Sequence, residues 1–291
     1  MPGTFLSTNE RERLACFPDD IPHWDLITYF TLTEPDRSLV DTYQSDANRL
    51  GTAIQLCAVR YLGFCPANLQ AAPGEMMAFL ARQLQVDPTA LQTYGTRRMT
   101  RSTHFNAVLH HLGFRRVQPE DHEPIVGWLT ERALEHDKPT LLLQTVCEHL
   151  KQQHMLRPAV TTLERWVVTA RMQAHDESLH RLQPLLTPDC IVLLDSLLVP
   201  EPNKGTAQLS WLRQHATSNT PVALLDTLGK LTLLQTWNVD AWELAALNPN
   251  RQKFLARLGR KYTVQALRRM GPERRYPILL SLLRQTLRPD R

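Results

Sequence analysis

Apolar residues recur every three or four positions along almost the whole of this 291-residue chain, and this spacing limits the fold more than any other feature. The spacing matches the 3.6-residue turn of an α-helix, whereas a half-buried strand needs strict alternation. No alternating run of β-branched residues is long enough to predict a strand, and most of the twenty prolines and eleven glycines fall between the periodic segments. We therefore predict an all-α fold.

The run 45–63 shows how individual helix ends are predicted. Ser45 or Asp46 is a suitable N-cap, and Gly63 provides the residue without a side chain that commonly ends a helix. The same reasoning predicts further helices over 22–32, 34–44, 73–85, 87–94, 101–112, 119–136, 139–154, 158–183, 188–198, 206–216, 220–236, 240–246, 248–260, 263–270 and 272–287.

The helices group into three predicted domains. Residues 1–135 form a first helical domain, and 136–200 form a second domain of helix-turn-helix type. Residues 201–291 form a basic helical region. The most loop-like stretch, VPEPNKGT at 199–206, marks the boundary before this last region.

Positive charge is concentrated at the end of the chain. Residues 251–291 carry 12 basic and 2 acidic side chains, whereas residues 1–50 carry 4 basic and 9 acidic ones. Only six of the 33 basic residues are lysine, and arginine favours bidentate phosphate contacts, although a GC-rich gene would also raise the arginine content. The tail helices are amphipathic, so their basic face suits either DNA or an acidic partner.

Several classes of function lack a sequence signal. The chain has no Gly-rich phosphate loop, no nucleophile elbow and no C-x-x-C pair among its five cysteines. The histidine pairs 149/154 and 175/180 are five residues apart, whereas a zinc-binding helix needs a spacing of four. Asp19 and Asp20 lie in a proline-bounded turn, where paired aspartates commonly cap a helix. From these observations together we expect no catalytic, cofactor or metal site. With no secretory signal and no membrane-length apolar run, we expect a cytoplasmic location and no membrane partner.

The first candidate DNA-binding module covers 75–102. An amphipathic helix is followed by a short turn, then by Asp87 as N-cap and Pro88 at the first position of a second helix. This is the spacing of a helix-turn-helix, although such pairs also occur in any helical bundle. The residues expected to contact DNA phosphates follow the second helix: Arg97, Arg98, Thr100, Arg101 and Ser102.

The second candidate module covers 139–171. A helix ends near Leu156, Arg157 and Pro158 break the chain, and a second helix begins. The polar side of that helix should enter the major groove, while the alternative is a pair of packed helices whose polar residues face water. The residues expected to contact DNA are Arg157, Thr161, Thr162 and Arg165, opposite the inward Val160, Leu163 and Val167.

Long phrases of the sequence resemble a known family. They include FLSTNERERLACFPDDIP near the start, APGEMMAFLARQLQVDPTALQTYG in the middle, and NPNRQKFLARLGRKYTVQALRRMGPERRYPILLSLL near the end. Together they make the chain similar to the N-terminal region of Tn-three-type transposases, the enzymes of replicative, cointegrate-forming transposons. The resemblance implies tandem helix-turn-helix-like domains that bind the terminal inverted repeats, followed by a helical region that helps form a homodimer.

The resemblance also implies what this chain does not carry. In the family, a magnesium-dependent carboxylate triad lies in a separate domain much further along, so we expect no strand-transfer chemistry and no cofactor here. The leading hypothesis is therefore a module that binds double-stranded DNA at transposon ends. The alternative hypotheses are a helical protein-interaction module and a truncated repressor of transposition.

Overall fold

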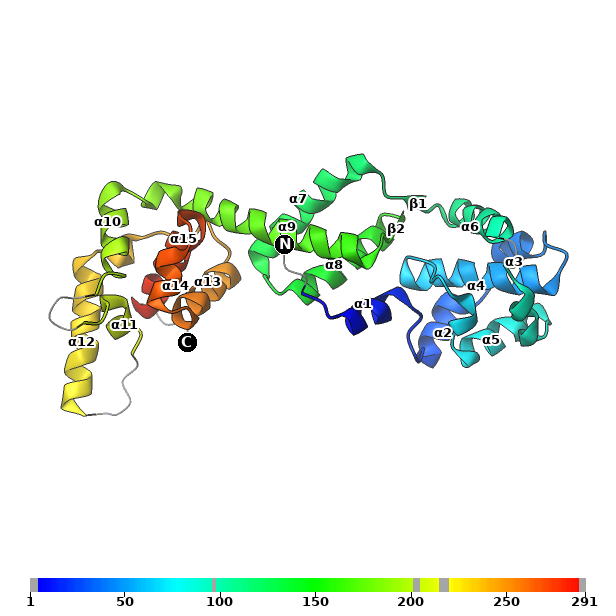
Figure 1. Cartoon of the computed structure of the whole chain (residues 1–291), viewed down its shortest axis with the longest axis horizontal. Coiled ribbons are helices and arrows are strands. Elements are labelled where there is room, and N and C mark those ends of the chain that lie inside the picture. Colours follow the sequence, from blue (N-terminus) through cyan, green and yellow to red (C-terminus); the bar gives the residue numbers. More distant parts are fainter. Residues whose placement is uncertain (1–4, 96–97, 201–204, 215–219, 288–291) are drawn as a thin grey trace. The chain divides into compact units, whose positions relative to one another are not determined.

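The computed structural model describes residues 5–95, 98–200, 205–214 and 220–287, and the fold is all-α, as predicted (Figure 1). Its α-helices are α1 (Thr8–Ala15), α2 (His23–Phe30), α3 (Glu34–Val40), α4 (Asp46–Leu62), α5 (Gly74–Leu84), α6 (Arg98–Leu112), α7 (His122–Glu135), α8 (Pro139–Gln152), α9 (Val160–Leu182), α10 (Pro188–Ser196), α11 (Gln208–Leu212), α12 (Pro221–Thr236), α13 (Pro249–Lys261), α14 (Val264–Arg269) and α15 (Pro272–Leu287).

Short elements connect these helices. They are the 3-10 helices η1 (Leu69–Ala71), η2 (Pro88–Thr93), η3 (Pro119–Asp121), η4 (Gln183–Leu185) and η5 (Val239–Ala241), and the two-residue strands β1 (Arg115–Arg116) and β2 (Met155–Leu156). The two strands pair in parallel.

The chain folds into two compact units. Unit 1 consists of 1–126 with 139–168, and unit 2 consists of 127–138 with 169–291. Because the boundaries fall inside α7 and α9, each of these helices contributes residues to both units. The three predicted domains, 1–135, 136–200 and 201–291, are defined by which segments fold independently. The two compact units are defined by contacts alone, so the three-domain division stays a prediction.

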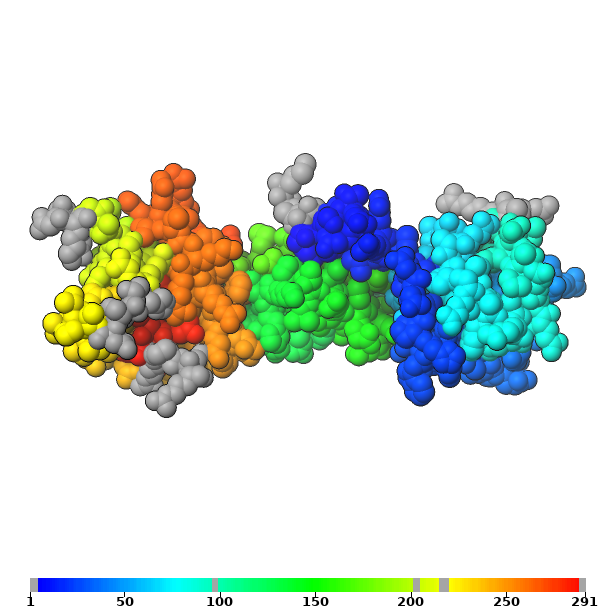
Figure 2. All heavy atoms as spheres, turned by 90° about the horizontal axis from the view of Figure 1, so that it is seen from below, coloured from blue at the N-terminus to red at the C-terminus, as the bar shows by residue number. Residues whose placement is uncertain are grey.

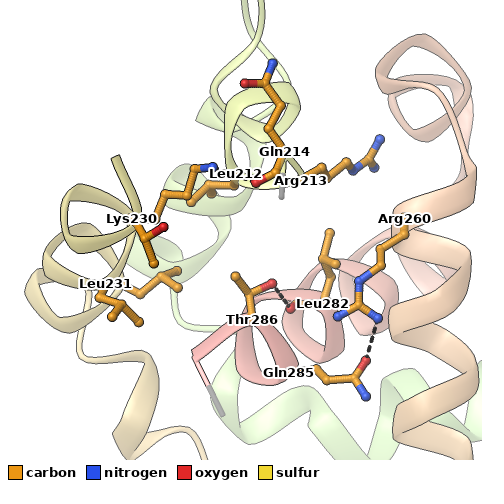
Figure 3. Close-up of a pocket in the computed structure, with 11 residues that line it drawn as sticks. Leu212, Arg213, Gln214, Lys230, Leu231, Arg260, Leu282, Gln285 and Thr286 are labelled. Carbon is orange, nitrogen blue, oxygen red and sulfur yellow. Dashed lines mark hydrogen bonds between the residues drawn. The ribbon is translucent and has the colours of Figure 1, made fainter. Parts of the chain in front are cut away.

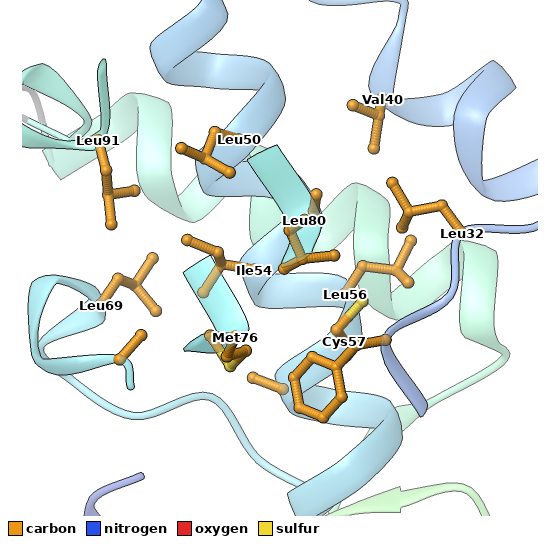
Figure 4. Close-up of a cluster of buried hydrophobic side chains, with 14 of the residues drawn as sticks. Leu32, Val40, Leu50, Ile54, Leu56, Cys57, Leu69, Met76, Leu80 and Leu91 are labelled. Carbon is orange, nitrogen blue, oxygen red and sulfur yellow. The ribbon is translucent and has the colours of Figure 1, made fainter. Parts of the chain in front are cut away.

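Helix α4 lies at the centre of unit 1, where it packs against α2, α3, α5, α6 and η2. Ser45 caps it by accepting a hydrogen bond from the backbone N–H of Asn48, and Gly63 ends it with a left-handed backbone (φ 74°). Leu50, Ile54 and Leu56 on α4 are fully buried among apolar side chains of the neighbouring helices (Figure 4). The predicted helix 45–63 and both of its ends are therefore confirmed.

Unit 2 is built around the packing of α13 against α15. Close approach of the two helices needs Gly259, because a Cβ added there would lie 2.9 Å from the Cβ of Leu282. Leu255, Ile278 and Leu279 are buried in the same core, together with residues of α10, α11 and α12. This core fixes one side of α13, so its other side is available to solvent.

Two of the predicted helices are wrong. Residues 87–94 do not form an α-helix: Pro88–Thr93 make the 3-10 helix η2, which Asp87 caps at Thr89 and which Tyr94 closes by donating to the carbonyl of Leu91. The buried pair Leu91 and Tyr94 is three residues apart, a spacing that fits a 3-10 helix as well as an α-helix. Residues 240–246 likewise give only the end of η5.

Candidate nucleic-acid interface

The first two turns of α9 present polar side chains that the sequence assigns to the second module. Thr161 and Arg165 are exposed, and Thr162 is half-buried. Arg165 donates a hydrogen bond to the hydroxyl of Thr162 at 3.3 Å, so the two side chains lie together. The opposite side of these two turns is anchored by the buried residues Val160, Leu163, Trp166 and Val167. The predicted division of the helix into a polar and an apolar side is therefore present.

An acidic residue that the sequence reasoning missed holds these turns in place. Glu164 is 3% exposed, and its carboxylate accepts hydrogen bonds from Nε of Arg11 at 2.5 Å and from the backbone N–H of Leu6 at 3.2 Å. Burial alone would raise the pKa of Glu164, but the bonds from Arg11 and Leu6 lower it below its usual value. Glu164 lies on the apolar side of α9. Because a buried charge needs a partner, an acidic residue in that position could have predicted an ion pair from the sequence.

Arg157 is used inside unit 1. Its guanidinium lies 3.5 Å from the ring centroid of Phe64 and donates a hydrogen bond to the carbonyl of Leu14. Burial lowers the pKa of this arginine. Its backbone N–H also donates to the carbonyl of Gly63 at 2.8 Å. These contacts hold the segment before α9 against α4 and α1, so the guanidinium is not available for phosphate.

Of the three arginines predicted to contact DNA in the first module, the structure describes the side chain of Arg101 alone. Arg97 lies outside the described residues, and of Arg98 only its place at the start of α6 is described. Arg101 donates to the backbone carbonyls of Pro66 at 2.9 Å and Ala67 at 2.5 Å. Thr100 is half-buried, and Ser102 is exposed. Because η2 is a 3-10 helix of six residues, no α-helix follows α5 at helix-turn-helix spacing.

The structure brings parts of the two predicted modules together within unit 1. Arg101 and Ser102 line a hollow of about 360 Å³, and Arg157 lines a neighbouring one of about 210 Å³. Cys65 and Phe105 border both hollows. Burial raises the pKa of Cys65 to about 11, so this thiol is a weak nucleophile at neutral pH. The thiol of Cys65 therefore gives neither hollow a reactive nucleophile.

Unit 2 contains a hollow of about 250 Å³ that is lined by three cations (Figure 3). Of the cations that line it, Lys230 donates to the carbonyl of Gln214 at 2.6 Å and pairs with Asp226, and Arg260 donates to Gln285 at 3.0 Å. The remaining arginine, Arg213, donates to the carbonyl of Tyr262 at 2.7 Å. All three cations already have partners within the protein.

Within the described ranges, no three His, Cys, Asp or Glu side chains gather closely enough to hold a metal ion. Among the helices described, none combines the length and apolar character that a membrane crossing requires.

Comparison with known proteins gives matches along almost the whole chain. Residues 5–170 match the family described as a domain of unknown function (DUF4158), and this range contains all nine predicted DNA-contacting residues. The chain is 32% identical to the transposase for transposon Tn501 of Pseudomonas aeruginosa, 30% identical to that for transposon Tn21 of Escherichia coli and 27% identical to that for transposon Tn1546 of Enterococcus faecium. Each match covers 96% of this chain but only 28% of the relative.

Proposed function

Because the chain belongs to the DUF4158 family and is homologous to Tn-three-type transposases over 96% of its length, we propose that it binds double-stranded DNA at the terminal inverted repeats of its transposon. The supporting observation is the first two turns of α9, where Thr161 and Arg165 are exposed and the opposite side of the helix is buried. An α-helix presented in this way fits the major groove, and arginine pairs bidentately with guanine.

The proposed contact set is narrower than the set predicted from sequence. Thr161, Thr162 and Arg165 read bases or grip adjacent phosphates, and Ser102 adds a hydroxyl from α6. Arg98 and Thr100 stay in the set as phosphate contacts near the start of α6, and Arg97 stays as a prediction outside the described residues. Arg101 and Arg157 leave it, because both guanidinium groups are bonded to backbone carbonyls.

The experiment that tests this function compares two duplexes with the full chain. One carries the terminal repeat of the transposon, and the other carries the same bases in scrambled order. At physiological salt and with excess competitor DNA, we expect the repeat to bind roughly 10³-fold more tightly or better. Equal affinity for both duplexes would refute the proposal.

We further propose that this chain acts by occupying the repeat. The relatives are named as transposases, but the chain spans 28% of their length. A chain that occupies the ends without cutting them competes with an active transposase, as a repressor does. Adding it to a transposition assay should then lower the frequency in proportion to repeat occupancy.

A second candidate function, protein interaction, is favoured by helix α12. Val222, Leu224, Leu225 and Leu228 on this helix are all more than half exposed, which is unusual for large apolar side chains on one element. We propose that a second copy of the chain covers them, as the expected homodimer requires. Sedimentation of Leu225→Lys against the unaltered chain tests this: the variant should be monomeric at concentrations where the original is dimeric.

A further inference from the structure

The two neighbouring hollows of unit 1 are each bordered by a buried polar atom that lacks a partner. The first hollow, of about 360 Å³, lies between α4, the loop after it and α6, and the second, of about 210 Å³, lies where the chain enters α9. Cys65 and Phe105 form a wall that both hollows share. Because buried polar atoms in proteins are nearly always hydrogen-bonded, two exceptions at one place indicate a binding site.

The unpartnered atom at the first hollow is an acceptor. Gln55, from the middle of α4, lines this hollow and is only 1% exposed. Its Nε2 donates a hydrogen bond to the carbonyl of Arg101 at 3.3 Å, but its Oε1 has no partner among the residues that the structure describes. A molecule that brought an N–H donor into the hollow would complete the hydrogen bonding of this amide.

The unpartnered atom at the second hollow is a donor. Arg157 lines this hollow and is held by other parts of its guanidinium, which stacks on the ring of Phe64 and donates from Nη2 to the carbonyl of Leu14. Its Nε is buried and has no hydrogen-bond partner within the described part of the chain. A ligand that reached both hollows would therefore meet an acceptor in the first and a donor in the second.

The walls of the hollows suit a flat ring. The half-buried ring of Phe105 borders both hollows, and Leu156 adds an apolar side chain to the second. The guanidinium of Arg116 lies 6.0 Å from the centroid of the Phe105 ring. Aromatic rings and guanidinium planes are the surfaces on which unstacked bases rest in proteins. The first hollow alone also exceeds the roughly 300 Å³ at which small-molecule sites begin.

The hollows lie next to the residues proposed to contact DNA. Ser102 of α6 lines the first hollow, and Val160, which directly precedes Thr161 on α9, lines the second. Ala15 at the end of α1 completes the wall of the second hollow. In Figure 2, α1 (dark blue) lies against the green segment that leads into α9. A base that left a duplex bound at α9 would thus have these hollows close to it.

We propose that the two hollows together bind a nucleobase that is not stacked in a helix. A nucleobase is a planar ring whose edges carry both N–H donors and acceptors, so it matches Gln55, Arg157 and the ring of Phe105 at once. The base can come from a nucleotide of the terminal repeat that has left the base stack, or from a free nucleoside. The first source rests on the proposed function of repeat binding, whereas the second does not.

The first experiment titrates the full chain with the free nucleoside of 2-aminopurine, a fluorescent base that carries an amino donor and ring acceptors. We expect a saturable change in its fluorescence at concentrations up to about 1 mM. Gln55→Met keeps the size of the side chain but removes the unpartnered acceptor. This variant should bind the nucleoside roughly 3- to 10-fold more weakly, the effect of one hydrogen bond.

A filled hollow provides a variant that removes no proposed contact. Ala67 is exposed and lines the first hollow, so Ala67→Phe places a ring inside it and should abolish nucleoside binding. The matched control is Ala78→Phe, because Ala78 is exposed on α5 and lines neither hollow. The control should bind as the unaltered chain does. Circular dichroism should show that all three variants are folded.

The second experiment places 2-aminopurine at each position of the terminal repeat in turn. The fluorescence of this base rises when it leaves the stack, so one position should brighten when the full chain binds the duplex. The rise should be lost with Ala67→Phe and kept with Ala78→Phe.

The two experiments together distinguish the sources of the base. A rise at one position of the repeat identifies DNA as the source, and nucleoside binding without such a rise identifies a free nucleoside; either result supports the proposal. No response in either experiment, or a response that Ala67→Phe or Gln55→Met leaves unchanged, would overturn it. A chain that binds the repeat no better than the scrambled duplex would refute the proposed function alone, because the nucleoside titration involves no DNA.

Discussion

Arg11 and Glu164 are 153 positions apart in the sequence, yet Nε of Arg11 lies 2.5 Å from the carboxylate of Glu164. This ion pair joins α1 to the turn of α9 that carries the proposed DNA contacts. The backbone N–H of Leu6 completes the arrangement by donating to the same carboxylate. The N-terminal segment is acidic overall. Through Leu6 and Arg11 it nevertheless holds α9, the helix proposed to contact DNA, in place.

We predict that Glu164→Gln destabilises unit 1 and weakens DNA binding together. The amide keeps the shape of the side chain but replaces one acceptor oxygen by an NH₂ donor and removes the charge that pairs with Arg11. We expect a cost of about 1–3 kcal/mol in the free energy of unfolding. Urea titration measures this loss. Glu177→Gln, which breaks the more exposed pair with Arg181, should change stability by less than about 1 kcal/mol. Equal losses of unfolding free energy in the two variants would show that the Arg11–Glu164 pair stabilises the protein no more than an exposed ion pair does.

The buried charge network of unit 2 should have a clear signature in stability. Arg251 is 1% exposed and donates hydrogen bonds to Ser178 and to Nδ1 of His175, both at 3.1 Å. Arg251→Met fits the space but leaves these acceptors without a donor. We predict a loss of roughly 3 kcal/mol in the unfolding free energy. Hydrogen exchange should locate the loss in α9, α13 and α15, and uniform loosening of unit 1 as well would contradict the prediction.

The same network predicts a pH dependence. Burial, with Arg251, Arg274 and Arg171 nearby, lowers the pKa of His175 to about 3, so the folded protein holds this imidazole neutral. The unfolded chain takes up the proton near pH 6.5, so the contribution to stability is complete above that pH and is lost as the pH falls towards 3. Between pH 7 and 5, this histidine should account for about 2 kcal/mol of lost stability.

His175→Asn checks the assignment, because an asparagine carbonyl can accept the bond from Arg251 but does not titrate. Urea unfolding of this variant should show a pH dependence that is flatter by the same amount. An unchanged dependence would assign the effect to other groups.

Removal of metal ions tests the expectation that no cofactor takes part. Since repeat binding is proposed to use only side chains and phosphates, EDTA should leave the affinity for the terminal repeat unchanged once ionic strength is matched. An affinity that falls with EDTA and returns with added Mg²⁺ would show a metal requirement.

Local signals in the sequence were sufficient for much of the fold. Ser45 and Gly63 mark the ends of α4 through interactions with their own neighbours, and Leu163 and Val167 reveal the buried side of α9 by their spacing. The interactions that shape the candidate site were not visible, because they are long-range. The carbonyl that Arg157 binds lies 143 residues earlier in the chain, at Leu14. A free arginine and a bonded one look the same in sequence.

The central claim, that the first two turns of α9 read bases, is tested most directly by one binding measurement. The affinity of Arg165→Ala and of the unaltered chain is determined for a library of terminal repeats that carry single base-pair changes. If Arg165 pairs with guanine, the variant loses about 1–3 kcal/mol on the native repeat and loses discrimination at one or two base pairs only. An equal loss on every member of the library would instead contradict base reading and make Arg165 a phosphate contact.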